Sequence, residues 1–268
     1  MIQNDNKIRH LLERYAGEYN TPSFIGNDPV QFPRKYTDKR DIEITALLVS
    51  TISWGKRAMI LRNADKMLGL MHNEPYRFVT EGDFSEISSQ NIHRTFFSRH
   101  LIYYLNGLRE IYTHYPSLED FAVASGAVAA EAPAWELAKD LNAILCDANG
   151  NKTEEASRCL PSKPESSALK RLNMALRWLI RNDGIVDIGC WTAIRPDRLY
   201  IPLDVHVGNI SRRLGLLTRQ QNDRKAVIEL TDALRRYRPD DPTVYDFALF
   251  GLGVSGEAAN NGILIPEQ

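Results

Sequence analysis

The sequence has few cysteines and no long apolar run. Its 268 residues include three cysteines, an odd number at wide spacing, which fits neither a disulfide framework nor a cysteine-rich zinc site. No stretch of about 18 or more apolar residues occurs, so we do not expect a membrane-spanning helix. The segment Met1–Arg14 is polar and lacks the apolar stretch of a signal peptide. We therefore expect a cytoplasmic protein that has no contact with a membrane.

Signatures of common ligand-binding sites are also missing. There is no P-loop, no dinucleotide-binding glycine pattern and no cluster of metal-ligating residues, so we expect neither a cofactor nor a metal. No alternation of apolar and polar residues persists along the chain, and no internal repeat is visible. The sequence therefore predicts an all-α fold, long enough for one large domain or two small ones.

The net charge of −1 does not by itself indicate a nucleic-acid-binding protein, but the charge is unevenly distributed. Residues 166–238 contain 14 Lys or Arg and 7 Asp or Glu, a balance of +7, which leaves −8 for the rest of the chain. A basic region in an otherwise acidic chain is expected where a protein contacts phosphates, and arginine-rich solvated helix faces give the same count. The candidate phosphate contacts are Arg177, Arg181, Arg212 and Arg213.

Helical periodicity is clear in residues 168–181. Leucine and isoleucine recur there at steps of three and four, so they share one face of a helix. The polar residues on another face are Lys170, Asn173, Arg177 and Arg181. A second helix is expected at 208–217, and Asp204 precedes it in the sequence context of an N-cap, where a carboxylate accepts backbone N–H bonds. Asp204 is therefore either only a cap or a cap that also takes part in chemistry.

The same periodicity predicts the other helices. Asp41 is the expected N-cap of one of them, and the glycines at 251 and 253 are expected to end the last one. The expected ranges are 2–19, 41–53, 58–71, 96–112, 133–145, 224–237 and 244–251, and residues 117–129 are expected to form a short helix followed by a stretch of small residues.

The run PLDVHV at 202–207, followed by RRLGL at 212–216, resembles the helix-hairpin-helix DNA glycosylases. In that superfamily an aspartate in this context is the catalytic carboxylate, and in members with AP-lyase activity an upstream lysine is the nucleophile. The resemblance thus implies catalytic roles for Asp204 and Lys170.

The chain departs from the common members of that superfamily in two ways. The glycine-containing hairpin LPGVG is replaced by NDGIVDIGCW at 182–191, and the spacing from lysine to aspartate is longer. Both features resemble the archaeal 8-oxoguanine glycosylase branch, and the whole chain resembles a bacterial family of the superfamily. The implied fold has two helical subdomains with a cleft between them, residues 41–182 and residues 1–40 with 183–268. No cysteine follows Cys190, so the iron–sulfur cluster of some members is not expected.

Three further residues are candidates for binding an extruded base. Gln31, in a proline-flanked segment, either packs on the surface or offers its amide to a base edge. Trp54, flanked by small and charged residues, is either a core residue or a platform on which a base stacks. Asp246 resembles the aspartate that helps bind the flipped base in the archaeal branch, and it also fits the first turn of a helix, where the dipole favours a carboxylate.

The resemblance implies an enzyme of DNA base-excision repair, which we expect to be a monomer. It would remove an oxidised purine, 8-oxoguanine being the first choice, and cleave the strand through a Schiff base on Lys170. Lys170 also fits a plain exposed helix lysine, and Lys56 is another candidate nucleophile. The alternative prediction is a non-catalytic nucleic-acid-binding protein on a glycosylase-like scaffold. A small-molecule enzyme has no motif in its favour.

Overall fold

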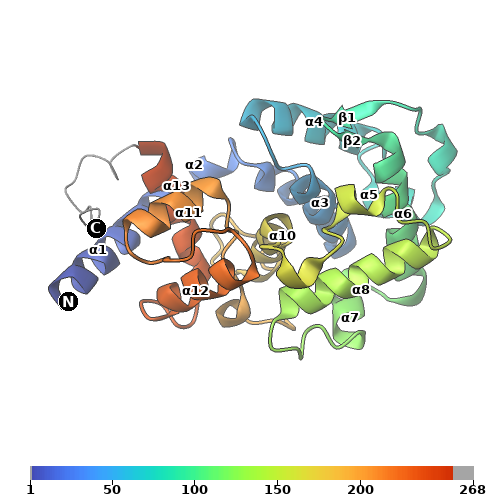
Figure 1. Ribbon diagram of the computed structural model, residues 1–268. Helices are drawn as coiled ribbons and strands as arrows, with labels where there is room; N and C mark the ends of the chain where they lie inside the picture. Colours follow the sequence, from blue (N-terminus) through green and yellow to red (C-terminus); the bar gives the residue numbers. More distant parts are fainter. Residues whose placement is uncertain (1, 256–268) are drawn as a thin grey trace.

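The computed structural model describes residues 2–255, most of which lie in α-helices (Figure 1). The α-helices are α1 Ile2–Tyr19, α2 Pro22–Ile25, α3 Lys39–Thr51, α4 Arg57–Gly69, α5 Pro75–Glu81, α6 Ser98–His114, α7 Leu118–Ala124, α8 Pro133–Ala148, α9 Ala156–Cys159, α10 Lys170–Ile180, α11 Val205–Arg213, α12 Arg224–Arg235 and α13 Tyr245–Ser255. The 3₁₀ turns are η1 Pro29–Gln31, η2 Pro33–Lys35, η3 Phe84–Glu86, η4 Pro164–Ser166, η5 Pro196–Arg198 and η6 Pro242–Val244.

The predicted all-α character is confirmed at this coarse level, with one exception among the described residues. Strand β1 (Asn91–His93) pairs antiparallel with β2 (Phe96–Phe97) and leads directly into α6. Strands of three and two residues are too short to show a period-two pattern, which explains why the sequence did not indicate this hairpin.

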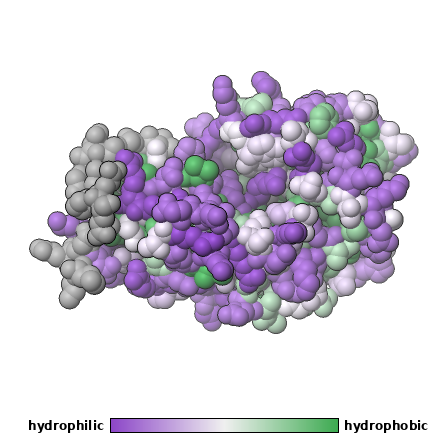
Figure 2. Space-filling view, in the orientation of Figure 1, coloured by the Kyte–Doolittle hydropathy of each residue, from purple (hydrophilic) through white to green (hydrophobic). Residues whose placement is uncertain are grey.

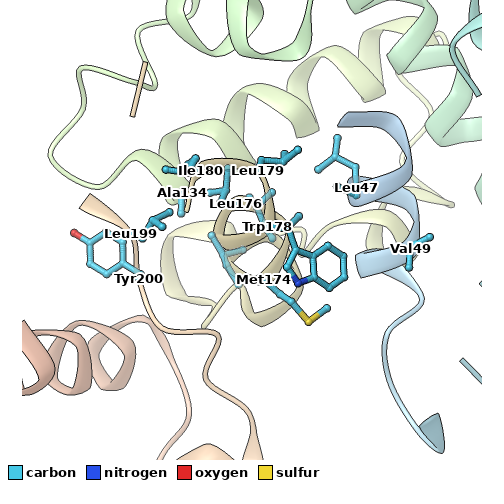
Figure 3. Packing of buried hydrophobic residues seen from close by; sticks show 14 of the residues in the cluster. Leu47, Val49, Ala134, Met174, Leu176, Trp178, Leu179, Ile180, Leu199 and Tyr200 are labelled. Carbon is cyan, nitrogen blue, oxygen red and sulfur yellow. The ribbon is translucent and has the colours of Figure 1, made fainter. Parts of the chain in front are cut away.

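Helix α10 is the buried centre of the fold. Every residue from Leu172 to Ile180 is buried, so α10 is covered on all sides rather than on one face. Figure 3 shows Trp178 on the side of Val49 of α3, whereas Ile180 points toward Ala134 of α8. Because neighbours surround α10, they hold its backbone firmly, and a side chain at its first turn is held with it.

Helices from the two ends of the chain pack together. Helix α1 lies along α13, and α11 also packs on α13, whereas α6 packs on α8 and α3 on α10 (Figure 1). The contact of α1 with α13 is close at Gly251, where a Cβ atom would lie 2.4 Å from the ring of Tyr19. One hydrophobic cluster includes residues from both groups of helices. The expected division into 41–182 and 1–40 with 183–268 stays a prediction.

Several helices begin at a side chain that caps the first turn. Asp38 caps α3, Ser117 caps α7 and Asp223 caps α12, each accepting a backbone N–H bond. The expected cap Asp41 was wrong by three residues, because α3 begins earlier. Asp41 instead accepts the backbone N–H of Tyr76 at 2.8 Å. The last helix also continues past the glycines that were expected to end it.

The surface in view is largely hydrophilic, with only small, scattered apolar areas (Figure 2). Val123 and Val205 are exposed large hydrophobic residues, and they lie far apart in the sequence. Within residues 2–255, no helix combines the length and the apolar character needed to cross a membrane.

Candidate catalytic site

Lys170 is the first residue of α10 and is partly buried. Its Nζ contacts the sulfur of Met174 at 3.7 Å, one turn further along the helix, and no carboxylate of the described residues forms an ion pair with it. Leu169, directly before it, is buried and has a φ of +48°, in the left-handed region that branched side chains rarely adopt. The local conformation that begins α10 is therefore strained, and packing around Leu169 maintains it.

Asp204 is the N-cap of α11, as its sequence context predicted. Its Oδ1 accepts the backbone N–H of Val207 at 3.0 Å, and its own backbone is extended. No hydrogen bond to Oδ2 occurs among the described residues, and the residue is only partly buried. One carboxylate oxygen thus anchors Asp204, and the other is left for a further partner.

Asp246 brings the candidate residues into one region. It lies in the first turn of α13, and its side chain retains 13% exposure, so a ligand can still reach it. Burial raises the pKa of its carboxyl group to about 6, against the positive charge of Arg177, which lowers it. The charges of Asp204 and Lys170 also act on this pKa, the first raising it and the second lowering it. Arg177 of α10 contacts Asp246, and α11, whose N-cap is Asp204, packs on α13, so the elements that carry the three candidate residues meet in one region.

Arg177 and Arg181 are buried, and the candidate phosphate contacts at these two positions were wrong. Arg177 contacts Asp246 and Asp187, the latter at 3.3 Å, and Arg181 contacts Asp187 and Asp241, the latter at 2.9 Å. Arg177 and Arg181 are 3% and 2% exposed, so no phosphate can reach them without unpacking the fold. The polar face of α10 is therefore packed against aspartates from the following segments rather than facing solvent.

Gln31 and Asp28 lie in a turn beside this network. The amide of Gln31 donates to the carbonyls of Gly26 at 2.9 Å and Asp28 at 3.1 Å, so its donors hold the turn together. Asp28 is buried and caps η1 through the N–H of Val30. Burial raises the pKa of Asp28, while its hydrogen bond to Val30 and the charges of Arg177 and Lys170 lower it. A base-binding role for Gln31 stays a prediction that depends on its carbonyl oxygen alone.

Trp54 is half-buried between two partners. The rings of Trp54 and His93 are nearly perpendicular, and their centroids lie 4.6 Å apart. The guanidinium of Arg171 lies 5.3 Å from the centroid of the Trp54 ring. The imidazole of His93 also bonds to the Trp54 carbonyl at 2.8 Å. These contacts hold the Trp54 ring in place, and one of them comes from Arg171, the residue after Lys170. Stacking of the ring on a base stays a prediction.

Arg212 is linked to the backbone of Asp204 through Asn222, whereas Arg213 is exposed. The guanidinium of Arg212 binds the Asn222 side chain at 2.6 Å, and the Asn222 amide donates to the Asp204 carbonyl at 3.1 Å. Gly208 leaves room for this contact, because a Cβ there would lie 2.8 Å from Arg212 and 2.9 Å from Asn222. Arg212 is thus a positioning residue in the described structure, and Arg213 remains a candidate phosphate contact.

Sequence reasoning missed Asp28, Asp187 and Asn222. Asp28 and Asp187 belong to the buried network, and Asn222 links two candidate residues. The sequence did contain an indication of this network: several aspartates lie in irregular segments, and the helix carries regularly spaced arginines. That pattern fits charge pairing as well as phosphate binding.

Comparison with known proteins gives one match. Residues 28–255 match the family described as "Protein of unknown function (DUF2400)". No curated protein and no solved structure matches the chain.

Proposed function

The chain belongs to the family of proteins of unknown function DUF2400, and we propose that it is a DNA glycosylase with AP-lyase activity that removes an oxidised purine, 8-oxoguanine being the first candidate. The observation that carries the proposal is that Lys170 of α10, the N-cap Asp204 of α11 and Asp246 of α13 belong to elements that contact one another. The sequence around Asp204 resembles that of DNA glycosylases, and the replaced hairpin and the longer spacing from Lys170 to Asp204 resemble the 8-oxoguanine branch, which supports the substrate class.

The lysine amine is the nucleophile in this mechanism. Lys170 has no carboxylate partner among the described residues, so its amine is available to attack C1′ of the sugar. The new C1′–N bond forms as the bond to the base breaks, and the base leaves with that electron pair. The free amine must be the attacking form, and the proton that it loses passes to a nearby carboxylate.

The two carboxyl groups take different parts because their environments differ. Asp204, with one oxygen held by the helix start, stabilises the positive charge that develops on the sugar and accepts the amine proton. Asp246, whose pKa burial raises to about 6, is partly protonated near neutral pH and supplies a proton to the departing base.

Strand cleavage follows from the lysine adduct. Opening of the sugar ring gives a Schiff base between Lys170 and C1′, which makes the C2′ proton acidic. Removal of that proton by a carboxylate, with departure of the 3′ phosphate together with the C–O bonding electrons, breaks the strand. Water then hydrolyses the Schiff base and releases the lysine.

Borohydride trapping tests the proposal. Purified protein is mixed with duplexes that carry 8-oxoguanine or an abasic site, beside the Lys170→Gln variant and the matched control Lys56→Gln. We expect a covalent adduct with the wild type and with Lys56→Gln and none with Lys170→Gln. Since Lys170 makes no ion pair among the described residues, Lys170→Gln should change the free energy of unfolding by less than about 1 kcal/mol.

Each other result has a definite meaning. An adduct that survives in Lys170→Gln moves the nucleophile to another residue. Absence of an adduct from the wild type on both substrates, with DNA binding that weakens as salt rises, refutes the lyase and favours the non-catalytic binding protein.

A further inference from the structure

A cavity of about 280 Å³ lies beside the start of α10. The end of α3, helix α6, the segment at the end of α9, the start of α10 and Asn222 line it, and Lys170 is among the lining residues. Asp204 and Asp246 do not line it, so it is distinct from the acidic group described above. This volume is many times what one water molecule needs, so a group larger than a bare ion fits.

Arg171 contributes a positive charge to the cavity wall. Its guanidinium donates to the Thr51 carbonyl at 2.7 Å, and no carboxylate of the described residues forms an ion pair with it. Arg177 and Arg181, by contrast, are paired with aspartates. Burial lowers the pKa of Arg171, but an arginine starts so high that it keeps its charge. A partly buried cation with unused donors favours an anionic ligand.

The first turn of α10 opens onto the same cavity. Leu169, Lys170 and Arg171 line it, and no side chain caps this helix. The first backbone N–H groups of a helix have no partner inside the helix, and the dipole makes this end positive. In an 11-residue helix, an uncapped first turn offers hydrogen bonds of the kind that hold a phosphate.

The hydroxyl group of Tyr104 is independent evidence that the cavity binds a ligand. It lines the cavity, is fully buried and lies next to the polar Thr51 side chain. Its hydroxyl nevertheless has no hydrogen-bond partner among the described residues. Buried hydroxyl groups are nearly always bonded, so an unpartnered one in a cavity wall points to a group that enters the cavity.

We propose that this cavity binds a phosphate carried on a deoxyribose, with the phosphate on Arg171 and the first turn of α10 and with the Tyr104 hydroxyl completing the site. Lys170 lines the same cavity, so the phosphate would be one that flanks the reacting sugar. This second step rests on the proposed function, whereas phosphate binding itself does not.

Calorimetric titration of the full chain with thymidine monophosphate, and with thymidine as its uncharged counterpart, tests the first step. The variants are Arg171→Met, Arg171→Lys and Tyr104→Phe, with Arg77→Met as the matched control at an exposed arginine of α5. We expect the nucleotide to bind more tightly than the nucleoside, Arg171→Met to weaken it at least about tenfold, and Arg171→Lys to restore part of the loss. Tyr104→Phe should weaken it a few-fold, and Arg77→Met should leave it unchanged.

Equal affinity for nucleotide and nucleoside would overturn the phosphate site, as would full nucleotide affinity in both Arg171→Met and Tyr104→Phe. Far-ultraviolet circular dichroism of each variant checks its fold, and Tyr104→Phe keeps the test valid if Arg171→Met does not fold.

The source of the phosphate is tested with duplexes that contain an abasic site and one neutral methylphosphonate, placed 5′ or 3′ to that site. At one of the two positions, we expect neutralisation to weaken binding about tenfold in the wild type and little in Arg171→Met. Equal losses in both proteins at both positions would assign the cavity to a free nucleotide and refute the strand contact. Nucleotide binding without borohydride trapping would refute the lyase alone, and trapping without nucleotide binding would refute the cavity site alone.

Discussion

Replacing Asp246 with asparagine should change how stability depends on pH. Asparagine has nearly the same shape but does not titrate. In the wild type, burial raises the pKa of Asp246 to about 6 from the ordinary 3.8. The folded protein therefore holds a proton that the unfolded chain has already lost between these two values, and this favours the folded state at low pH.

The magnitude follows from these two pKa values. A pKa of about 6 in place of 3.8 corresponds to about 3 kcal/mol, at about 1.36 kcal/mol for each pH unit. Stability from this group is fully present below about pH 4 and is lost as the pH rises through about 6. The free energy of unfolding of Asp246→Asn, relative to that of the wild type, should therefore rise by about 3 kcal/mol between pH 4 and pH 8. This rise is expected whatever the difference in stability between the two proteins at pH 4.

Urea denaturation of both proteins at a series of pH values measures this difference. Asp232→Asn, on an exposed aspartate of α12, is the matched control and should lack the rise because its carboxylate is in solvent. The reasoning would be refuted if the free energy of unfolding of the wild type increased relative to that of Asp246→Asn as the pH rises. That result would mean that the attraction of Arg177 outweighs burial and that Asp246 is fully ionised at neutral pH.

Two further predictions concern buried charged groups. Arg177→Met should cost about 3–5 kcal/mol in urea denaturation, because it leaves the buried Asp246 without its arginine and Asp187 with Arg181 alone, and a cost below about 1 kcal/mol would show that the network is not needed for stability. Glu43→Gln should cost about 2 kcal/mol or more, because the carboxylate accepts bonds from Tyr112 at 3.0 Å, from Trp191 at 2.7 Å and from two backbone N–H groups, and an amide NH₂ would oppose one of these donors. An unchanged midpoint of thermal unfolding would contradict that prediction.

The sequence predicted the helices well because their apolar periodicity reflects burial directly. The cap at Asp204 was also predictable, since a carboxylate before an apolar-periodic run satisfies a local requirement of the helix start. The partners of the polar face of α10 were not predictable, because arginines that bind phosphate and arginines that pair with aspartate occur at the same helical spacing. Only the fold shows that Asp187 and Asp241, both outside that helix, meet Arg181.

The grouping of the candidate residues depends on contacts between distant segments. Lys170 and Asp204 were expected to act together on resemblance alone, and α13 links their helices, because its Asp246 contacts Arg177 of α10 and α11 packs on it. The cavity beside Arg171 had no signal in the sequence, because its walls come from five segments, each with ordinary composition.

The pairing of α10 with late aspartates has a consequence for the order in which the chain folds. During synthesis, Arg177 and Arg181 leave the ribosome before Asp241 and Asp246, which complete their charge balance. Helix α13 also provides the surface on which α1, made first, comes to rest. The early helices therefore cannot reach their final packing on a nascent chain that ends near residue 182, and the acidic side of the candidate site is completed only as the last helix emerges.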